Sequence, residues 1–310
     1  MGGQNCTLYY LLHLLHQFLK PTKMLKQIII ILITAIIYNA CNNPKSETKP
    51  TVSVTVIPQQ FFVNQIAGDW LNVNVMIPPG GNEHTYEPTP NQIKALSKSS
   101  AYLRIGHLSF ESAWMDKLAS VSPNMKIFDT SEGLDLIEGD CEDHADHNHH
   151  HLHEVYNPHI WLSPMLVKGQ AVKIFEVLNK MYPEHGETMK LNLDRFVMQI
   201  DSVHQQLIEQ LKHAEGSSFI VYHPVWTYMA RDYKLNEVAI ELNGKEATAD
   251  KLKNIIDLAN EKNIRTIFVQ KEFSDAQART VANEIKGNVV TMNPLNYNWF
   301  NTMKEFGEAF

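Results

Sequence analysis

Strand-like and helix-like segments alternate along most of this chain from residue 51 onward. The strand-like runs are 51–57, 71–77, 101–106, 125–129, 217–222, 235–240, 266–270 and 288–293, and the helical segments are 61–70, 91–99, 110–120, 248–262 and 275–286. The runs are short and rich in β-branched residues, and the segments between them carry apolar residues every three or four positions. This alternation predicts an α/β fold with mostly parallel sheets and flanking helices.

One long apolar stripe interrupts the alternation. Between residues 183 and 213, apolar side chains recur in steps of three and four, and Pro183 suits the first turn of a helix. A helix of this length would extend about 46 Å, because each residue adds roughly 1.5 Å. We therefore predict an N-terminal lobe over 51–182, a long connecting helix over 183–213 and a C-terminal lobe over 214–310.

The N-terminal region has the features of a targeting segment. From Met24, a positive flank at Lys26 is followed by an apolar run over 28–37, which is shorter than the about 20 residues that span a bilayer. Small residues and Cys41 come next, an order typical of a secretory signal peptide that resembles the lipobox of bacterial lipoproteins. We expect a signal or anchor region over 1–41 with a lipid on Cys41.

The polar, Pro-containing stretch 42–50 would then serve as a tether. An uncut N-terminal anchor is the alternative, and both interpretations place the rest of the protein outside the cytoplasm. Met24 is a candidate for the true start, since a second apolar stretch precedes it.

Histidine is the unusual residue of this composition, with fifteen in 310 residues and a formal net charge of −7. The negative charge argues against nucleic-acid binding, and three cysteines do not make a disulfide scaffold. Cys141 could be an extra ligand or an oxidisable thiol.

Six histidines lie in the tract 142–154: His144, His147, His149, His150, His151 and His153. Such a tract suits Zn²⁺, Cu²⁺ or Ni²⁺, although a solvated loop is the alternative. We expect an accessory site of modest affinity, because the tract must become ordered to bind.

Three isolated histidines lie near the ends of predicted elements. His84 follows the strand that ends at Ile77, His223 directly follows the strand 217–222, and His159 precedes a helix. Ligands of open α/β sheets bind at the carboxyl ends of the strands, so these side chains are candidates for a metal site.

The segments around these histidines are GNEHTYEPTP, NPHIWLSP and YHPVWTYMARDYKL, in that order. Together they resemble the cluster A-I metal-binding receptors of bacterial ABC importers over most of residues 51–300. The resemblance implies two lobes joined by a rigid helix, with Zn²⁺ or Mn²⁺ held between them by His84, His159 and His223. It also implies a monomer that is not an enzyme and that passes its metal to a separate permease and ATPase.

Zinc is the favoured metal, because three neutral imidazoles suit Zn²⁺ better than Mn²⁺, which prefers more oxygen ligands. Manganese-type members of the family typically carry a carboxylate where His223 stands. The histidine tract of the family also goes with zinc uptake.

The fourth ligand is open. Many members supply a carboxylate near the last strand, but TMNPLNYN here offers Asn293 and Asn296 and no acid. Glu83 and a water molecule are the two candidates, whereas Glu87 and Glu272 are interpreted as structural or surface residues.

Two other functions fit parts of the pattern. Three histidines with an open position also describe a catalytic zinc, so an exported zinc hydrolase with Glu83 as general base is the alternative, although the chain lacks HExxH. A metal-dependent surface adhesin of the same fold is the other.

Overall fold

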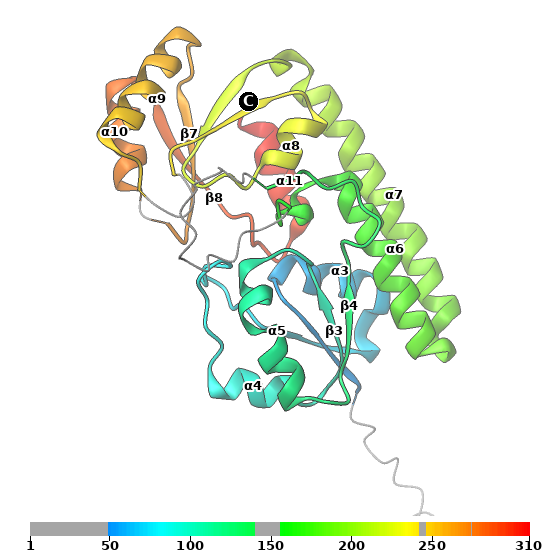
Figure 1. Cartoon of the computed structure of the whole chain (residues 1–310). Helices are drawn as coiled ribbons and strands as arrows, with labels where there is room; N and C mark the ends of the chain where they lie inside the picture. Colours follow the sequence, from blue (N-terminus) through cyan, green and yellow to red (C-terminus); the bar gives the residue numbers. More distant parts are fainter. Residues whose placement is uncertain (1–48, 140–155, 242–245, 274) are drawn as a thin grey trace, which may run out of the picture. The chain divides into compact units, whose positions relative to one another are not determined.

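The computed structural model describes residues 49–139, 156–241, 246–273 and 275–310. The predictions for Cys41, Cys141 and the six tract histidines concern residues outside these ranges. In the part described, two four-stranded parallel sheets have the orders β2-β1-β3-β4 and β6-β5-β7-β8 (Figure 1). The strands are β1 (Thr51–Val54), β2 (Asn72–Val75), β3 (Ser99–Arg104), β4 (Lys126–Asp129), β5 (Ser218–Val221), β6 (Asn236–Ala239), β7 (Thr266–Gln270) and β8 (Asn288–Met292). The α/β prediction is thus confirmed.

Helices connect the strands and cover the sheets. The α-helices are α3 (Ile57–Ala67), α4 (Pro90–Leu96), α5 (Ser109–Val121), α6 (Pro164–Met181), α7 (Gly186–Leu211), α8 (Thr227–Asp232), α9 (Ala249–Glu261), α10 (Ala276–Glu284) and α11 (Trp299–Glu308). Single 3₁₀ turns are η1 (Gly68–Trp70), η2 (Ile160–Leu162), η3 (Pro183–His185) and η4 (Lys212–Ala214). None of the helices in the described part combines the length and apolarity needed to cross a membrane.

The first strand is shorter than its sequence pattern indicates. The β-branched run extends to Ile57, but β1 ends at Val54 and α3 begins at Ile57 with Pro58 in its first turn. The side chain of Gln59 accepts a hydrogen bond from the backbone N–H of Thr55, at 2.9 Å, which supports this early start. A proline without an N–H favours the first helical turn over a strand interior.

The long helix is confirmed, with different ends. Pro183 begins the 3₁₀ turn η3, the regular helix α7 runs from Gly186 to Leu211, and η4 follows it. Its apolar stripe is buried, and it packs against α3 beside the first sheet and against α11 beside the second. The α7 helix therefore connects the two lobes.

The sequence analysis missed α6, which packs along α7 and runs beside it in Figure 1. The Ser163 side chain accepts from the backbone N–H of Leu166, and Pro164 occupies the first turn, so α6 has an ordinary start. An ion pair between Lys168 and Asp201, at 2.8 Å, joins the two helices. The α6 helix therefore packs along the connecting helix α7 and against α3. The short helices α8 and α11 were also missed.

The hydrophobic core extends from the first sheet through α6 and α7 to one face of the second sheet. On that face, Trp299 and Phe306 of α11 are buried with Phe219 and Phe268 of the sheet. A second cluster, which includes Ile220 and Ile267, lies on the opposite face. Strands buried on both faces explain the nearly continuous apolar runs of the C-terminal lobe.

Candidate metal centre

Four side chains from distant parts of the chain meet at one point. The possible ligand atoms of Glu83, His84, His159 and His223 all lie within 4.8 Å of one another. Glu83 and His84 lie in the loop after β2, His159 directly precedes η2, and His223 follows β5. The structure therefore brings the three predicted histidines together with Glu83, one of the two candidates for the fourth ligand. No other group of three or more His, Cys, Asp or Glu in the described ranges comes together in this way.

Short side chains hold the loops that carry two of the histidines. The Asn82 Oδ1 atom accepts hydrogen bonds from the backbone N–H groups of His84, at 2.9 Å, and Thr85, at 3.2 Å. The Asn157 Oδ1 atom likewise accepts from the backbone N–H of His159, at 3.0 Å. In both segments the asparagine lies two residues before the histidine, where its side chain bonds the backbone and fixes a local turn.

The imidazole of His159 is held in the tautomer and protonation state that can bind a cation. Its Nδ1 lies 2.9 Å from Asn157 Oδ1, and because this amide oxygen can only accept, Nδ1 carries the proton and Nε2 is left with a lone pair. Burial, and then the neighbouring His223 and His84, hold the pKa of His159 well below its ordinary value. The ring is therefore neutral, which is the form that binds metals.

Two buried atoms at the centre lack hydrogen-bond partners within the described part of the chain. They are His159 Nε2 and Glu83 Oε1, which lie 3.8 Å apart, too far for a hydrogen bond. Glu83 is 1% exposed and His159 is 2% exposed, so leaving these atoms unpaired is costly. A cation between them would satisfy both.

His223 and His84 make a chain of contacts across the centre. The Nε2 atoms of the two rings are 3.0 Å apart, His223 Nδ1 lies 3.0 Å from Glu241 Oε1, and His84 Nδ1 lies 3.2 Å from Ser109 Oγ. Phe273 stacks on the His223 ring with centroids 5.0 Å apart. All three histidines thus have a polar partner on Nδ1, which leaves Nε2 directed at the centre.

Sequence reasoning missed Glu241, Ser109 and Asn157. Glu241 had a usable signal, because it follows β6 as His223 follows β5, at the same carboxyl edge of the same sheet. The hydroxyl of Ser109, at the start of α5, and the amide of Asn157 give no comparable signal.

The donor set and spacing fit Zn²⁺. Zinc–nitrogen bonds are about 2.0–2.1 Å, so two ligand atoms on a tetrahedral zinc lie about 3.3 Å apart. The candidate atoms lie within 4.8 Å of one another, so movements on the order of 1 Å would complete the shell. Three imidazoles and one carboxylate form a set that suits zinc better than manganese or magnesium.

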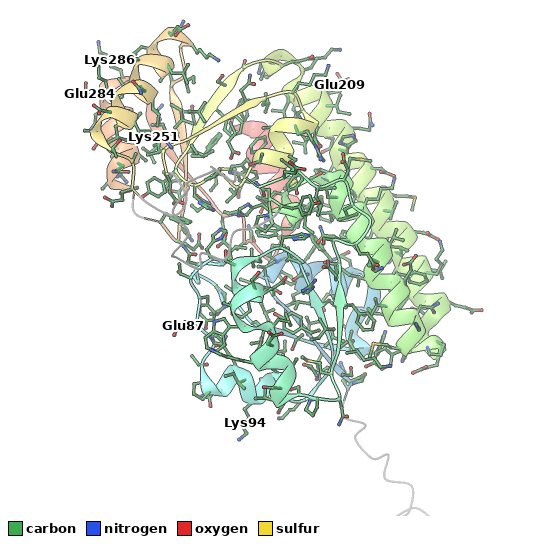
Figure 2. The ribbon with its side chains drawn as sticks, viewed as in Figure 1. Glu87, Lys94, Glu209, Lys251, Glu284 and Lys286 are labelled. Carbon is green, nitrogen blue, oxygen red and sulfur yellow. The ribbon has the colours of Figure 1, made fainter. Side chains whose placement is uncertain are left out.

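The other acidic candidates lie outside this group. Glu87 is exposed at the surface (Figure 2). Glu272 is partly buried, and burial, followed by the charge of Glu83, raises its pKa. The Asn293 Oδ1 atom accepts from the backbone N–H of Leu295, at 3.1 Å, and so supports a local turn.

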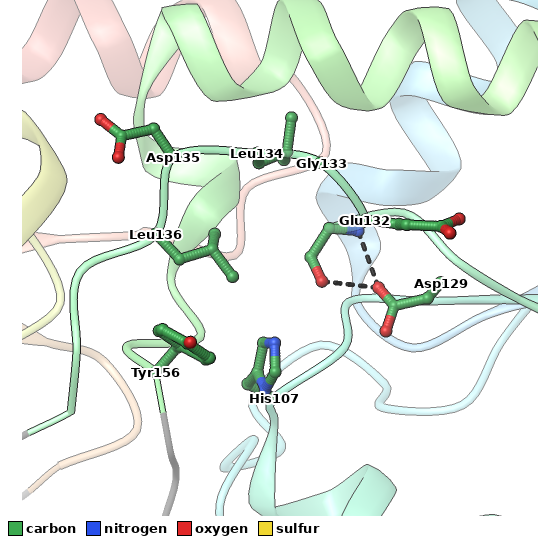
Figure 3. A pocket seen from close by; sticks show the side chains of 9 residues that line it. His107, Asp129, Glu132, Gly133, Leu134, Asp135, Leu136 and Tyr156 are labelled. Atoms are coloured by element: carbon green, nitrogen blue, oxygen red, sulfur yellow. Dashed lines mark hydrogen bonds between the residues drawn. The ribbon is translucent and has the colours of Figure 1, made fainter.

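A separate cavity of about 620 Å³ is lined by three acids, Asp129, Glu132 and Asp135, together with His107 (Figure 3). Two of its acids are already paired, Asp129 with Arg104 at 2.8 Å and Glu132 with Lys173 at 2.5 Å. Paired carboxylates are poor candidates for a metal, so the cavity does not compete with the histidine centre.

Comparison with known proteins identifies the family. A family model described as zinc-uptake complex component A, periplasmic, matches residues 52–309. The zinc-binding lipoprotein AdcA of Streptococcus pneumoniae is 28% identical over 85% of this chain and 54% of its own length. The high-affinity zinc uptake system protein ZnuA of Bacillus subtilis is 26% identical over 83% of this chain and 84% of its own. The chain thus spans about half the length of the AdcA relative and most of the ZnuA relative.

Solved structures agree with this assignment. A crystal structure described as ZnuA superposes with a TM-score of 0.78 at 36% identity, over 84% of this chain and 97% of that one. The laminin-binding protein Lmb of Streptococcus agalactiae superposes with a TM-score of 0.73 at 22% identity, over 84% of this chain and 99% of that one, and shows the shared fold. The chain therefore belongs to the family of periplasmic zinc-uptake component A proteins.

Proposed function

We propose that this protein captures Zn²⁺ outside the cytoplasm and delivers it to an ABC importer. The observation that supports the proposal most strongly is the pair of buried, unpartnered atoms, Glu83 Oε1 and His159 Nε2, within a group of three histidines. The names of the AdcA and ZnuA relatives, which describe zinc binding and zinc uptake, point to the same cargo.

In this proposal the ion is held by His84, His159, His223 and Glu83. His159 offers its lone pair without rearrangement, because Asn157 already fixes its tautomer. His84 and His223 exchange their mutual contact for the ion, and the Glu83 carboxylate contributes a negative charge. Glu83 and His84 follow β2 of the first sheet, and His223 follows β5 of the second. An ion bound to all of them therefore connects the two lobes.

The ligand count favours a receptor over a hydrolase. A catalytic zinc keeps one position for water or substrate, whereas four protein ligands close the shell of a tetrahedral ion. Glu83 lies inside the group of candidate ligand atoms, so we assign it as a ligand in place of a general base. Mn²⁺ is the less favoured cargo, because three imidazoles leave it few oxygen ligands.

The remaining features extend the proposal beyond the described residues. We assign Cys41 as the lipid-bearing residue that anchors a monomer to a bacterial membrane, and residues 142–154 as an accessory tract that gathers metal. A separately encoded permease and ATPase would accept the ion.

The proposal is tested by measuring zinc affinity by competition with a fluorescent chelator. We expect the full-length protein to bind one Zn²⁺ far more tightly than any further zinc ions, which we assign to residues 142–154. Each of the single replacements of His84, His159 and His223 by alanine should abolish that tight equivalent, because it removes one of the four proposed ligands from a largely buried site. His204→Ala, a histidine of α7 that contacts Tyr233 at 2.9 Å, is the matched control and should bind normally. A tight equivalent that survives all three changes would contradict the assignment.

A further inference from the structure

We propose that Glu241 is the positioning residue of the centre, which fixes the tautomer of His223 and supplies the second buried negative charge that a dication needs. The inference rests on the proposed zinc function and deepens it. Glu241 is 4% exposed and lies two residues after the end of β6. It is therefore at the carboxyl edge of the sheet, as His223 is. Nothing in the sequence pattern of the three histidine motifs points to this residue.

The three histidines differ in what holds their Nδ1 atoms. His159 has an amide oxygen of Asn157 at 2.9 Å and His84 has the hydroxyl of Ser109 at 3.2 Å. His223 has a carboxylate oxygen, Glu241 Oε1, at 3.0 Å. A carboxylate on the far nitrogen of a ligating imidazole fixes the ring and makes it a stronger donor to the metal. His223 is therefore the histidine with an anionic support.

Glu241 also sets the direction of a hydrogen-bond chain through the centre. A carboxylate accepts, so His223 Nδ1 donates and His223 Nε2 carries the lone pair. His84 Nε2 then donates to His223 Nε2, at 3.0 Å, which leaves His84 Nδ1 to accept from the Ser109 hydroxyl. The chain runs from Ser109 through both rings to Glu241.

Metal binding requires one change in this chain. His84 must move its proton from Nε2 to Nδ1 before Nε2 can bind the ion. Ser109 permits the change, because a hydroxyl can rotate from donor to acceptor. His223 needs no such change, since Glu241 already holds its proton on Nδ1.

The charge balance supports the same role. Glu83 and Glu241 are both almost completely buried, at 1% and 4% exposure, and together they would neutralise a divalent cation held by neutral imidazoles. A buried carboxylate favours a nearby cation, so two carboxylates close to the histidines favour a divalent ion there. Lys251 Nζ donates to the backbone oxygen of Glu241, at 3.2 Å, and helps to hold the residue at the edge of the sheet.

Three variants of the full-length protein separate these roles. Glu241→Gln keeps an acceptor for His223 Nδ1 and removes the charge, whereas Glu241→Ala removes both. Glu237→Gln, on the preceding strand β6, is the matched control, because the Glu237 carboxylate also accepts hydrogen bonds but from the backbone N–H of Trp226 and the Thr227 hydroxyl, at 2.8 and 2.7 Å. Zinc affinity, the Tm of the metal-free protein and the ¹⁵N NMR signals of the imidazoles are measured on each, and the His223 signal is assigned by its loss in His223→Ala.

We expect zinc affinity to fall about tenfold in Glu241→Gln and toward about a hundredfold in Glu241→Ala, with no change in Glu237→Gln. The metal-free NMR spectrum should show His223 protonated on Nδ1 in the wild type and in Glu241→Gln, and a mixture of tautomers in Glu241→Ala.

Wild-type zinc affinity in both Glu241 variants, or an unchanged tautomer in Glu241→Ala, would overturn the inference and leave the proposed function intact. A lower Tm without any loss of affinity would also overturn it, because that result describes a purely structural residue. Failure of the wild type itself to bind zinc tightly would instead contradict the proposed function.

Discussion

At the scale of single residues, the centre combines groups that the sequence predicts with groups that it does not. The three histidines could be predicted because each follows or precedes a regular element, and His159 and His223 also lie beside a proline. Two of the supporting partners come from distant parts of the chain: Ser109, at the start of α5, for His84, and Glu241, after β6, for His223. Those pairings depend on how the strands are ordered in each sheet, and single-sequence periodicity carries no information about strand order.

A buried carboxylate outside the centre, Glu111, predicts a pH effect on stability. Burial raises its pKa to about 7, although hydrogen bonds from Thr55 and from the backbone of Gly106 and Ile105 act in the opposite direction. The folded state therefore holds the proton more tightly than the unfolded state. The stabilisation is complete below about pH 4.5 and is lost as pH rises through 7.

We expect the free energy of unfolding of the metal-free wild type, relative to Glu111→Gln, to fall on the order of 3 kcal/mol between pH 4.5 and 7, since one pKa unit is worth about 1.4 kcal/mol. Urea titrations at several pH values measure this difference, in which the titration of the histidines cancels. A difference that does not vary with pH would show that Glu111 has an ordinary pKa.

At the scale of elements, the sequence predicted most strands and the long helix, because their apolar periodicity is strong. It missed α6, whose apolar face is interrupted by Gln170, and it extended the first strand past Val54 because Val56 and Ile57 continue a β-branched run. In both places a local feature determines where the helix starts: the Ser163 cap precedes α6, and Pro58 lies in the first turn of α3. Caps and prolines outweigh propensity over a few residues.

Gln170 of α6 predicts a stabilising substitution. Its side chain is fully buried, and neither amide atom has a hydrogen-bond partner among residues 49–139, 156–241, 246–273 and 275–310. Gln170→Met keeps the length of the side chain and removes both polar atoms, so the free energy of unfolding should rise by about 1–3 kcal/mol.

Chemical denaturation measures the effect, and Gln199→Met on the exposed face of α7 serves as control, with an expected change within about 0.5 kcal/mol. A less stable Gln170→Met protein would show that the amide is satisfied after all, for instance by buried water.

At the scale of the whole molecule, two similar sheets are held by α6 and α7, and the loops of both sheets supply the centre. Trp161, two residues after His159, donates to the backbone oxygen of Pro294 at 3.0 Å, and Trp299 donates to the backbone oxygen of Trp161 at 2.6 Å. These buried bonds join the His159 loop to the segment before α11. The lobes are therefore connected close to the centre as well as along the helices.

Zinc should stabilise this arrangement. At a free zinc concentration about 1,000 times the Kd, binding adds about 4 kcal/mol to the folded state, which corresponds to a rise in Tm on the order of 10 °C. Differential scanning calorimetry measures the rise, and Mg²⁺, which prefers oxygen ligands, should produce none. An equal rise with Mg²⁺ would indicate a general effect of divalent ions.

The histidine tract should act separately from the centre. Deleting residues 142–154 should remove the weaker zinc equivalents and retain the tight one, because the proposed ligands Glu83, His84, His159 and His223 already lie together at the centre. Isothermal titration calorimetry distinguishes the two classes, and loss of the tight equivalent would assign it to the tract.

The most direct test of the central claim is a crystal structure of the protein loaded with one equivalent of Zn²⁺, with the ion located by anomalous scattering at the zinc edge. We predict one strong peak at about 2.0–2.2 Å from the Nε2 atoms of His84, His159 and His223 and from a carboxylate oxygen of Glu83. A single peak elsewhere, or a zinc ion that lacks any of the three imidazoles, would contradict the account.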